Sequence, residues 1–136
     1  REKAIVEVLP EGEYDFEVVK TTEGVSKKNN NPMFTLELKF PNLRYPVKDW
    51  IMPTLTDTPL AVKKFKQSCR SVGILDKYEA GSVEHYHYDN KKGRARLVIE
   101  EFNGKQQNKV SEYLPYEHIQ QLDANGKPIA DDNIPF

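Results

Sequence analysis

The stretch that decides the fold is Phe34-Thr35-Leu36-Glu37-Leu38-Lys39-Phe40. Large apolar side chains occupy every second position in it, and polar side chains occupy the positions between them. Successive side chains of a β-strand point to opposite faces of a sheet, so this alternation predicts a strand with one buried face. The protein must therefore supply other strands or a helix to cover that face.

Two further strands are predicted on either side of this stretch. In the first, Tyr14, Phe16 and Val18 alternate with Asp15, Glu17 and Val19. Residues 23–32 contain a glycine, two lysines and three consecutive asparagines, and they are predicted to form a long flexible loop. A third strand is predicted over residues 44–52. Its core-facing residues are Tyr45, Val47 and Ile51, and its opposite face carries Arg44, Lys48 and Trp50.

The apolar spacing becomes helical after residue 57. Thr58 is predicted to cap a helix whose first residue is Pro59, and Gly73 is predicted to end it in a left-handed conformation. The residues predicted to face the core are Ala61, Phe65, Cys69 and Val72. A short second helical turn is expected over residues 75–78.

A β-hairpin is predicted after the helices. Residues 94–102 have Ala95, Leu97 and Ile99 on one face and Arg94, Arg96 and Phe102 on the other. Asn103-Gly104 is the strongest short-range hairpin signal in the chain, and residues 108–114 are the expected returning strand. A short helix is expected over residues 116–122.

The order of three strands, a helix and a hairpin predicts a mainly β protein. It is the order of an OB-fold: a five-stranded antiparallel barrel with one helix between strands 3 and 4, here with short extra helical turns. We expect this domain to span residues 1–122, followed by a short linker and an acidic tail over residues 123–136.

Composition sets mild limits on this prediction. Charged residues make up 30% of the 136-residue chain, and mean hydropathy is −0.73. No apolar run has the length of a membrane span or a signal sequence, so we expect a cytoplasmic protein without a membrane partner. The lone Cys69 is consistent with a reducing compartment. The oligomeric state stays open, a homo-oligomer included.

The chain ends in Asp131-Asp132-Asn133-Ile134-Pro135-Phe136. An aromatic ring beside a terminal carboxylate, preceded by acids, suits an apolar pocket rimmed by Arg or Lys. The hexapeptide resembles the C-terminal tip of bacterial single-stranded DNA-binding proteins, Asp-Asp-Asp-Ile-Pro-Phe, with Asn133 in place of the third Asp. This resemblance implies that the tail recruits replication, recombination and repair proteins.

The body of the chain resembles a family of small bacteriophage proteins suspected of binding single-stranded DNA. The similarity extends from residue 10 to residue 114 and rests mainly on residues 65–73, 76–81 and 93–97. It implies that the protein binds and protects single strands during phage DNA replication or recombination, in the cytoplasm of a bacterial host.

The charge is distributed unevenly along the chain. Net charge is −1, from 20 basic and 21 acidic residues, but three of the acids and only one base lie from Asp123 onward. The body thus carries 19 bases and 18 acids. One basic cluster contains Lys63, Lys64, Lys66, Arg70 and Lys77, and another contains Lys91, Lys92, Arg94 and Arg96. An acidic tail on a locally basic body is expected where tail and nucleic acid compete for one surface.

Binding of single strands without sequence preference needs cations for phosphates and exposed rings for base stacking. Trp50 and Phe102 each share a predicted strand face with basic residues, although Trp50 is equally suited to the core. The candidate DNA-binding residues are Lys27, Lys28, Arg44, Lys48, Trp50, Tyr86, Tyr88, Lys91, Lys92, Arg94, Arg96, Phe102 and Lys105.

A metal site is the alternative use of residues 85–89. In an extended strand, His85, His87 and Asp89 would share one face, with Tyr86 and Tyr88 on the other for stacking or for covering the core. A metal-dependent nuclease or junction-processing enzyme is therefore the second hypothesis, and an adaptor that acts only through its tail is the third. The chain has neither a glycine-rich phosphate loop nor a nucleophile elbow, so we expect no enzyme, no metal and no cofactor.

Overall fold

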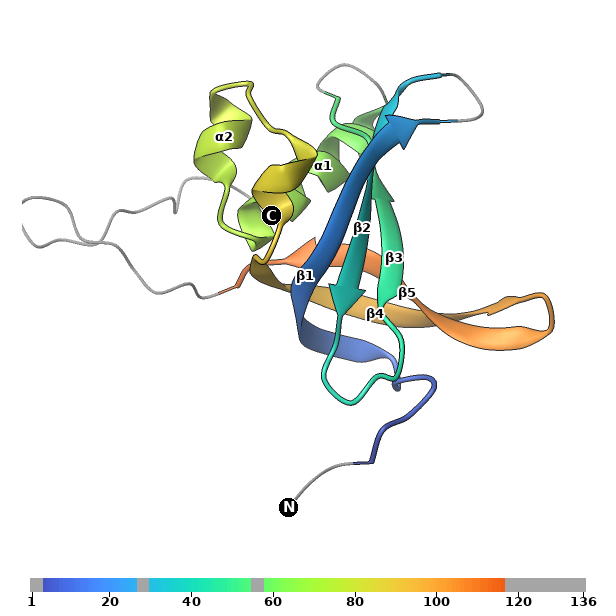
Figure 1. Ribbon diagram of the computed structural model, residues 1–136. Coiled ribbons are helices and arrows are strands. Elements are labelled where there is room, and N and C mark those ends of the chain that lie inside the picture. The colour runs from blue at the N-terminus through green and yellow to red at the C-terminus, as the bar shows by residue number, and fades with distance from the viewer. Residues whose placement is uncertain (1–3, 27–29, 55–57, 117–136) are drawn as a thin grey trace, which may run out of the picture.

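The computed structural model describes residues 4–26, 30–54 and 58–116 (Figure 1). Five strands form one antiparallel sheet in the order β3-β2-β1-β4-β5. The strands are β1 (Gly12–Val25), β2 (Pro32–Lys39), β3 (Val47–Ile51), β4 (Lys92–Phe102) and β5 (Lys105–Leu114). Helices α1 (Pro59–Ser71) and α2 (Leu75–Glu79) and the 3-10 helix η1 (His85–Tyr88) lie between β3 and β4 in the chain. The predicted mainly β, OB-fold-like order is confirmed.

Strands β1 and β2 form a long ribbon with an irregularity that the sequence did not reveal. Phe16 and Val18 are buried as predicted, but the register shifts between Val18 and Lys20. The shift turns Lys20 outward and Thr21 into the core. The ribbon continues to Val25, which pairs with Pro32, so the predicted loop over residues 23–32 is too long. Only residues 26–31 separate the two strands.

Strand β3 is shorter than predicted and begins at Val47. Tyr45, predicted to face the core, is 64% exposed. The segment before the strand instead follows the N-terminal part of the chain, because Val6 bridges Leu43 and the Arg44 amide donates to the Val6 carbonyl. Within β3 the alternation holds: Val47, Asp49 and Ile51 are buried, and Lys48 and Trp50 between them are exposed.

Helix α1 has the predicted boundaries. The Thr58 hydroxyl accepts a hydrogen bond from the Ala61 amide, Pro59 opens the helix, and Gly73 has a φ of 82° just after it. Phe65 and Cys69 are buried against the sheet, where α1 contacts β3, β4 and β5. The second helical turn is also confirmed and extends over Leu75–Glu79.

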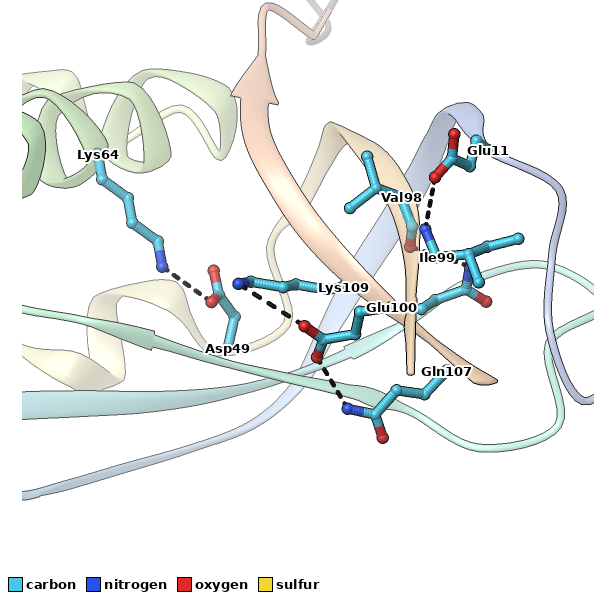
Figure 2. A network of polar contacts seen from close by, with 9 residues as sticks. Glu11, Asp49, Lys64, Val98, Ile99, Glu100, Gln107 and Lys109 are labelled. Atoms are coloured by element: carbon cyan, nitrogen blue, oxygen red, sulfur yellow. Dashed lines mark hydrogen bonds and ion pairs between the residues drawn. The ribbon is translucent and has the colours of Figure 1, made fainter. Parts of the chain in front are cut away.

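The β4–β5 hairpin turns at Asn103 and Gly104, with φ values of 54° and 78°, as an Asn-Gly turn requires. It projects beyond the rest of the sheet (Figure 1). The outer part of β4 is fastened to the segment before β1, because the Ile99 amide donates to Glu11 Oε2 (Figure 2). Asn108 of β5 bonds both backbone groups of Leu9. The predicted helix over residues 116–122 lies mostly outside the described residues.

The sheet does not close into the predicted barrel, because no backbone ladder joins its two edge strands in the described residues. Among the described residues, β3 pairs only with β2, and β5 pairs only with β4. A side-chain contact spans the gap instead, since the Tyr113 hydroxyl of β5 donates to Asp49 Oδ2 of β3 over 2.6 Å. The rings of Phe16, Phe40 and Tyr113 pack together in the core. None of the described helices has the length and apolar character needed to cross a bilayer.

Candidate nucleic-acid interface

Trp50 lies on the outer face of the sheet. It occupies an exposed position between buried Asp49 and Ile51, and 49% of its surface is exposed. The alternative that Trp50 belongs to the core is therefore wrong. The ladder places it beside Thr35 of β2, which in turn lies beside Thr22 of β1. The indole thus lies at the edge of an uncharged row that crosses three strands.

A second row, next to the first, carries charges. Lys48 of β3 lies beside Glu37 of β2, and Glu37 lies beside Lys20 of β1. Lys20 and Lys48 are exposed, and neither makes an ion pair with any described residue. The two ammonium groups therefore stay available to a ligand that reaches this face. We call the six residues of both rows the outer face: Lys20, Thr22, Thr35, Glu37, Lys48 and Trp50.

Lys20 was missed in the sequence analysis for a structural reason. Simple alternation from Phe16 and Val18 puts residue 20 on the buried side of the strand. The irregularity at residue 19 reverses that alternation, and Thr21 becomes the buried residue. Val19 itself is exposed. The sequence around this position contains no glycine or proline that signals the shift.

The basic residues of β4 lie among carboxylates. Arg94 Nη1 bonds Asp15 Oδ1 over 2.6 Å, and its Nε lies 3.8 Å from Glu13 Oε1. Arg96 is exposed but lies between Glu13 of β1 and Glu112 of β5 in the ladder. Carboxylates on β1 thus already compensate the charge of Arg94, so its guanidinium is less available to a further anion than the ammonium groups of Lys20 and Lys48.

Arg44 is not on the same strand as Trp50. It precedes β3, pairs with Glu7 over 3.5 Å, and places its guanidinium 5.8 Å from the centre of the Tyr45 ring. The predicted grouping of Arg44 with Lys48 and Trp50 on one strand face is therefore wrong. Arg44 belongs to a separate surface beside the N-terminal segment.

The tip of the β4–β5 hairpin carries the second exposed ring among the candidates. Phe102 is 60% exposed and pairs across the turn with Lys105, which is also exposed. Behind the tip, Glu100 accepts a hydrogen bond from Gln107 and pairs with Lys109 (Figure 2). The hairpin thus presents at its end one ring and one cation, Lys105, that makes no ion pair with a described residue.

Residues 85–88 form a 3-10 helix, so the extended conformation that the metal-site alternative requires is not present there. Tyr88 is fully buried, its hydroxyl lies 2.7 Å from Ser68 Oγ, and burial raises its pKa well above the ordinary value. It cannot stack on a base. Tyr86 is exposed and lies against the His87 ring. Of the predicted pair, only Tyr86 is accessible to a ligand.

The candidate metal ligands of the alternative hypothesis make hydrogen bonds within the fold. Thr21 Oγ1 donates to Asp89 over 2.6 Å and lies 3.0 Å from His85 Nδ1, whereas His87 Nδ1 accepts from the Glu84 amide. No group of three or more His, Cys, Asp or Glu residues in the described ranges is arranged to hold a metal ion. The hypothesis of a metal site over residues 85–89 thus lacks its geometry.

The remaining candidates fall into two groups. Lys91 is exposed just before β4, and Lys92 is exposed at the first position of β4, beside Glu17 of β1. Lys27 and Lys28, and the tail residues Asp131, Asp132, Asn133, Ile134, Pro135 and Phe136, lie outside the described residues. No protein-family model and no curated protein matches this chain, so its resemblances to phage and bacterial proteins stay predictions.

Proposed function

We propose that this protein binds single-stranded DNA without sequence preference, through the outer face around Trp50. The observation that carries the proposal is the exposed indole next to a row that carries Lys48 of β3 and Lys20 of β1, neither of which makes an ion pair with a described residue. Because 49% of the Trp50 surface stays in water in the folded protein, that part of the ring contributes no burial energy to the fold. A ligand with flat, stackable rings and anionic linkages would cover it.

The chemistry of the two rows matches the two parts of a nucleotide. A base stacked on Trp50 would lie over the uncharged row, where Thr35 and Thr22 offer hydroxyls but no charge. Phosphates would lie over the row of Lys48 and Lys20. Base–aromatic stacking tolerates every base, so it contributes affinity without sequence preference. A base within a duplex is already stacked on both faces, which is why we expect weak duplex binding.

Glu37, between the two lysines, opposes this role. Its carboxylate repels phosphates and lowers the affinity that Lys20 and Lys48 provide. The outer face is therefore suited to moderate binding that salt weakens readily. Phe102 and Lys105 at the hairpin tip supply one further ring and cation for a longer strand.

The tail adds the second half of the proposed function. Asp131 to Phe136 would bring replication, recombination or repair proteins to DNA covered by this protein. The proposed interaction inserts the Phe136 ring into an apolar pocket of the partner, where a basic residue pairs with the terminal carboxylate. An adaptor without DNA affinity would use the same tail, but that hypothesis gives the exposed Trp50 ring no ligand.

A fluorescence titration tests the proposal directly, because Trp50 is the chain's one tryptophan. Single strands of different base composition should quench its emission with similar affinities, and duplex of the same length should bind far more weakly. The logarithm of the binding constant should fall linearly with the logarithm of salt concentration. Equal affinity for duplex and single strand, or a flat response to salt, would refute the proposal.

The same samples separate the alternative functions. Labelled single strands incubated with Mg²⁺, Mn²⁺ or a chelator should stay intact and migrate as complexes, and branched junctions should stay intact. Metal-dependent cleavage would favour the nuclease hypothesis, and neither shift nor cleavage would favour the adaptor.

A further inference from the structure

Lys64 joins helix α1 to strand β3 (Figure 2). Its Nζ donates to Asp49 Oδ1 over 2.9 Å and to the backbone carbonyl of Trp50 over 2.8 Å. The Asp49 side chain is only 7% exposed, whereas that of Lys64 is 36% exposed. One ammonium group thus holds both a nearly buried carboxylate and the peptide bond that follows the exposed indole.

The Trp50 carbonyl needs this donor because β3 is an edge strand. Among the described residues β3 pairs with β2 alone, and no strand supplies amides to its other side. A backbone carbonyl on an unpaired edge is otherwise held only by water. The Lys64 bond fixes the peptide after Trp50, and with it the direction in which the indole leaves the strand.

The charge of Lys64 compensates the carboxylate of Asp49 within the fold. Asp49 accepts from Lys64 at one oxygen and from the Tyr113 hydroxyl at the other. Removing the ammonium would leave the carboxylate without its cation in a nearly buried site, which is costly. Lys63, its neighbour in the same basic cluster, is exposed, and its side chain makes no ion pair or hydrogen bond with any described residue.

We infer that Lys64 is a positioning residue for the Trp50 ring and does not contact phosphate. The inference rests on the proposed function, because it assigns a role in DNA binding to a side chain that touches no DNA. It distinguishes Lys64 from the other members of the basic cluster, which the sequence alone cannot do. It also makes α1 part of the binding site, through one side chain.

The test compares Lys64→Met with Lys63→Met, two variants that remove the same charge from adjacent residues. Lys64→Met should bind single strands about three- to tenfold more weakly, the effect of losing one hydrogen bond. Its salt dependence should have the wild-type slope, because no phosphate contact is lost. Lys63→Met should bind like the wild-type protein. If Lys64→Met lowers the slope by about 0.7, the value for one phosphate contact on a single strand, Lys64 binds DNA directly and the inference is wrong.

A double variant separates positioning from stability. Lys64→Met with Asp49→Asn removes both charges, so no unpaired carboxylate stays buried, and an asparagine oxygen can still accept from Tyr113. Thermal stability should rise relative to Lys64→Met, while DNA affinity should stay low because the Trp50 carbonyl still lacks its donor. Recovery of affinity together with stability would show that Lys64 is merely structural.

A measurement on the free protein keeps the inference testable if the proposed function fails. In both variants that lack Lys64, acrylamide should quench Trp50 fluorescence more readily and the near-UV circular dichroism of the indole should weaken. Wild-type spectra in the variants would overturn the positioning role, whatever the protein binds. If the spectra of these variants change but the wild-type protein binds no DNA, the proposed function is refuted and the positioning role of Lys64 is supported.

Discussion

The hydroxyl of Tyr113 and the carboxylate of Asp49 join the two edges of the sheet. The hydroxyl donates to Asp49 Oδ2 over 2.6 Å, between two strands that share no ladder in the described residues. A side-chain bond therefore does what backbone pairing does in a closed barrel. Because Asp49 precedes Trp50, the closure also fixes the strand that carries the candidate stacking ring.

The first prediction concerns this bond. Tyr113→Phe should lower the free energy of unfolding by about 1–3 kcal/mol, because it leaves a buried carboxylate oxygen without its donor. Urea denaturation measures the change. Tyr45→Phe, at an exposed tyrosine, is the matched control and should leave stability unaltered. Equal stability of the two variants would show that the Tyr113 bond contributes nothing.

The second prediction concerns alkaline pH. Burial raises the pKa of the Cys69 thiol from 9.0 to about 12, and burial followed by the Asp49 charge raises the pKa of Tyr113 well above 10.0. An acid with a raised pKa holds its proton more tightly in the folded state. Its contribution to stability is complete below the unfolded pKa and is lost as pH rises toward the folded value.

The free energy of unfolding should therefore fall from about pH 9 upward and more steeply above about pH 10. Urea denaturation at a series of pH values measures the decline. In Cys69→Ala, the decline in the free energy of unfolding that begins near pH 9 should be absent, and the decline that begins near pH 10 should remain. A flat profile up to about pH 11 would contradict the burial of these groups.

The third prediction concerns Gly93. A Cβ at this position would lie 2.6 Å from Phe16 Cζ and 2.7 Å from Ser71 Oγ. Ser71 Oγ also bonds both backbone groups of Arg94, so it has little freedom to move. Gly93→Ala should destabilise the protein by about 1–3 kcal/mol. Gly24→Ala is the control, because nothing lies within 4 Å of its Cβ. Similar melting temperatures of Gly93→Ala and Gly24→Ala would contradict the predicted steric clash at residue 93.

The fourth prediction concerns the stacking ring. Trp50→Ala should weaken single-strand binding by about 1–3 kcal/mol without unfolding the protein, because the substitution removes the proposed stacking on a base but no residue of the core. Trp50→Phe should recover part of the affinity. Circular dichroism checks the fold, and labelled oligonucleotide anisotropy measures binding. Wild-type affinity in the alanine variant would move the binding site away from the outer face.

The fifth prediction concerns the tail. Deleting residues 131–136 should abolish partner binding but leave DNA affinity equal or higher, because the acids compete with phosphates for basic side chains. The gain should be largest at low salt, where charges are least screened. One residue added after Phe136 should also impair partner binding, because it moves the carboxylate. Capture of replication enzymes from nuclease-treated lysate by the deleted protein would contradict this prediction.

The sequence by itself determined the elements whose causes are local. The apolar alternation of Phe34 to Phe40 defines β2, Thr58 and Gly73 define the ends of α1, and Asn103-Gly104 defines the hairpin. Each of these signals depends on side chains within a few residues of one another. The order of the elements then indicated an OB-fold without further information.

Only the tertiary structure decided the features that depend on distant partners. The exposure of Lys20 follows from the register of β1 on β2, and the burial of Asp49 follows from Tyr113 and Lys64, which are far along the chain. Residues 85–88 form a 3-10 helix in which the Tyr88 hydroxyl bonds Ser68, and the next residue, Asp89, accepts a hydrogen bond from Thr21. Alternation predicts which side of a strand a residue occupies only where the register is regular, and it does not predict which partners lie on that side. Only the folded chain brings Lys64 and Tyr113 to the buried Asp49 and places Asp15 where it pairs with Arg94.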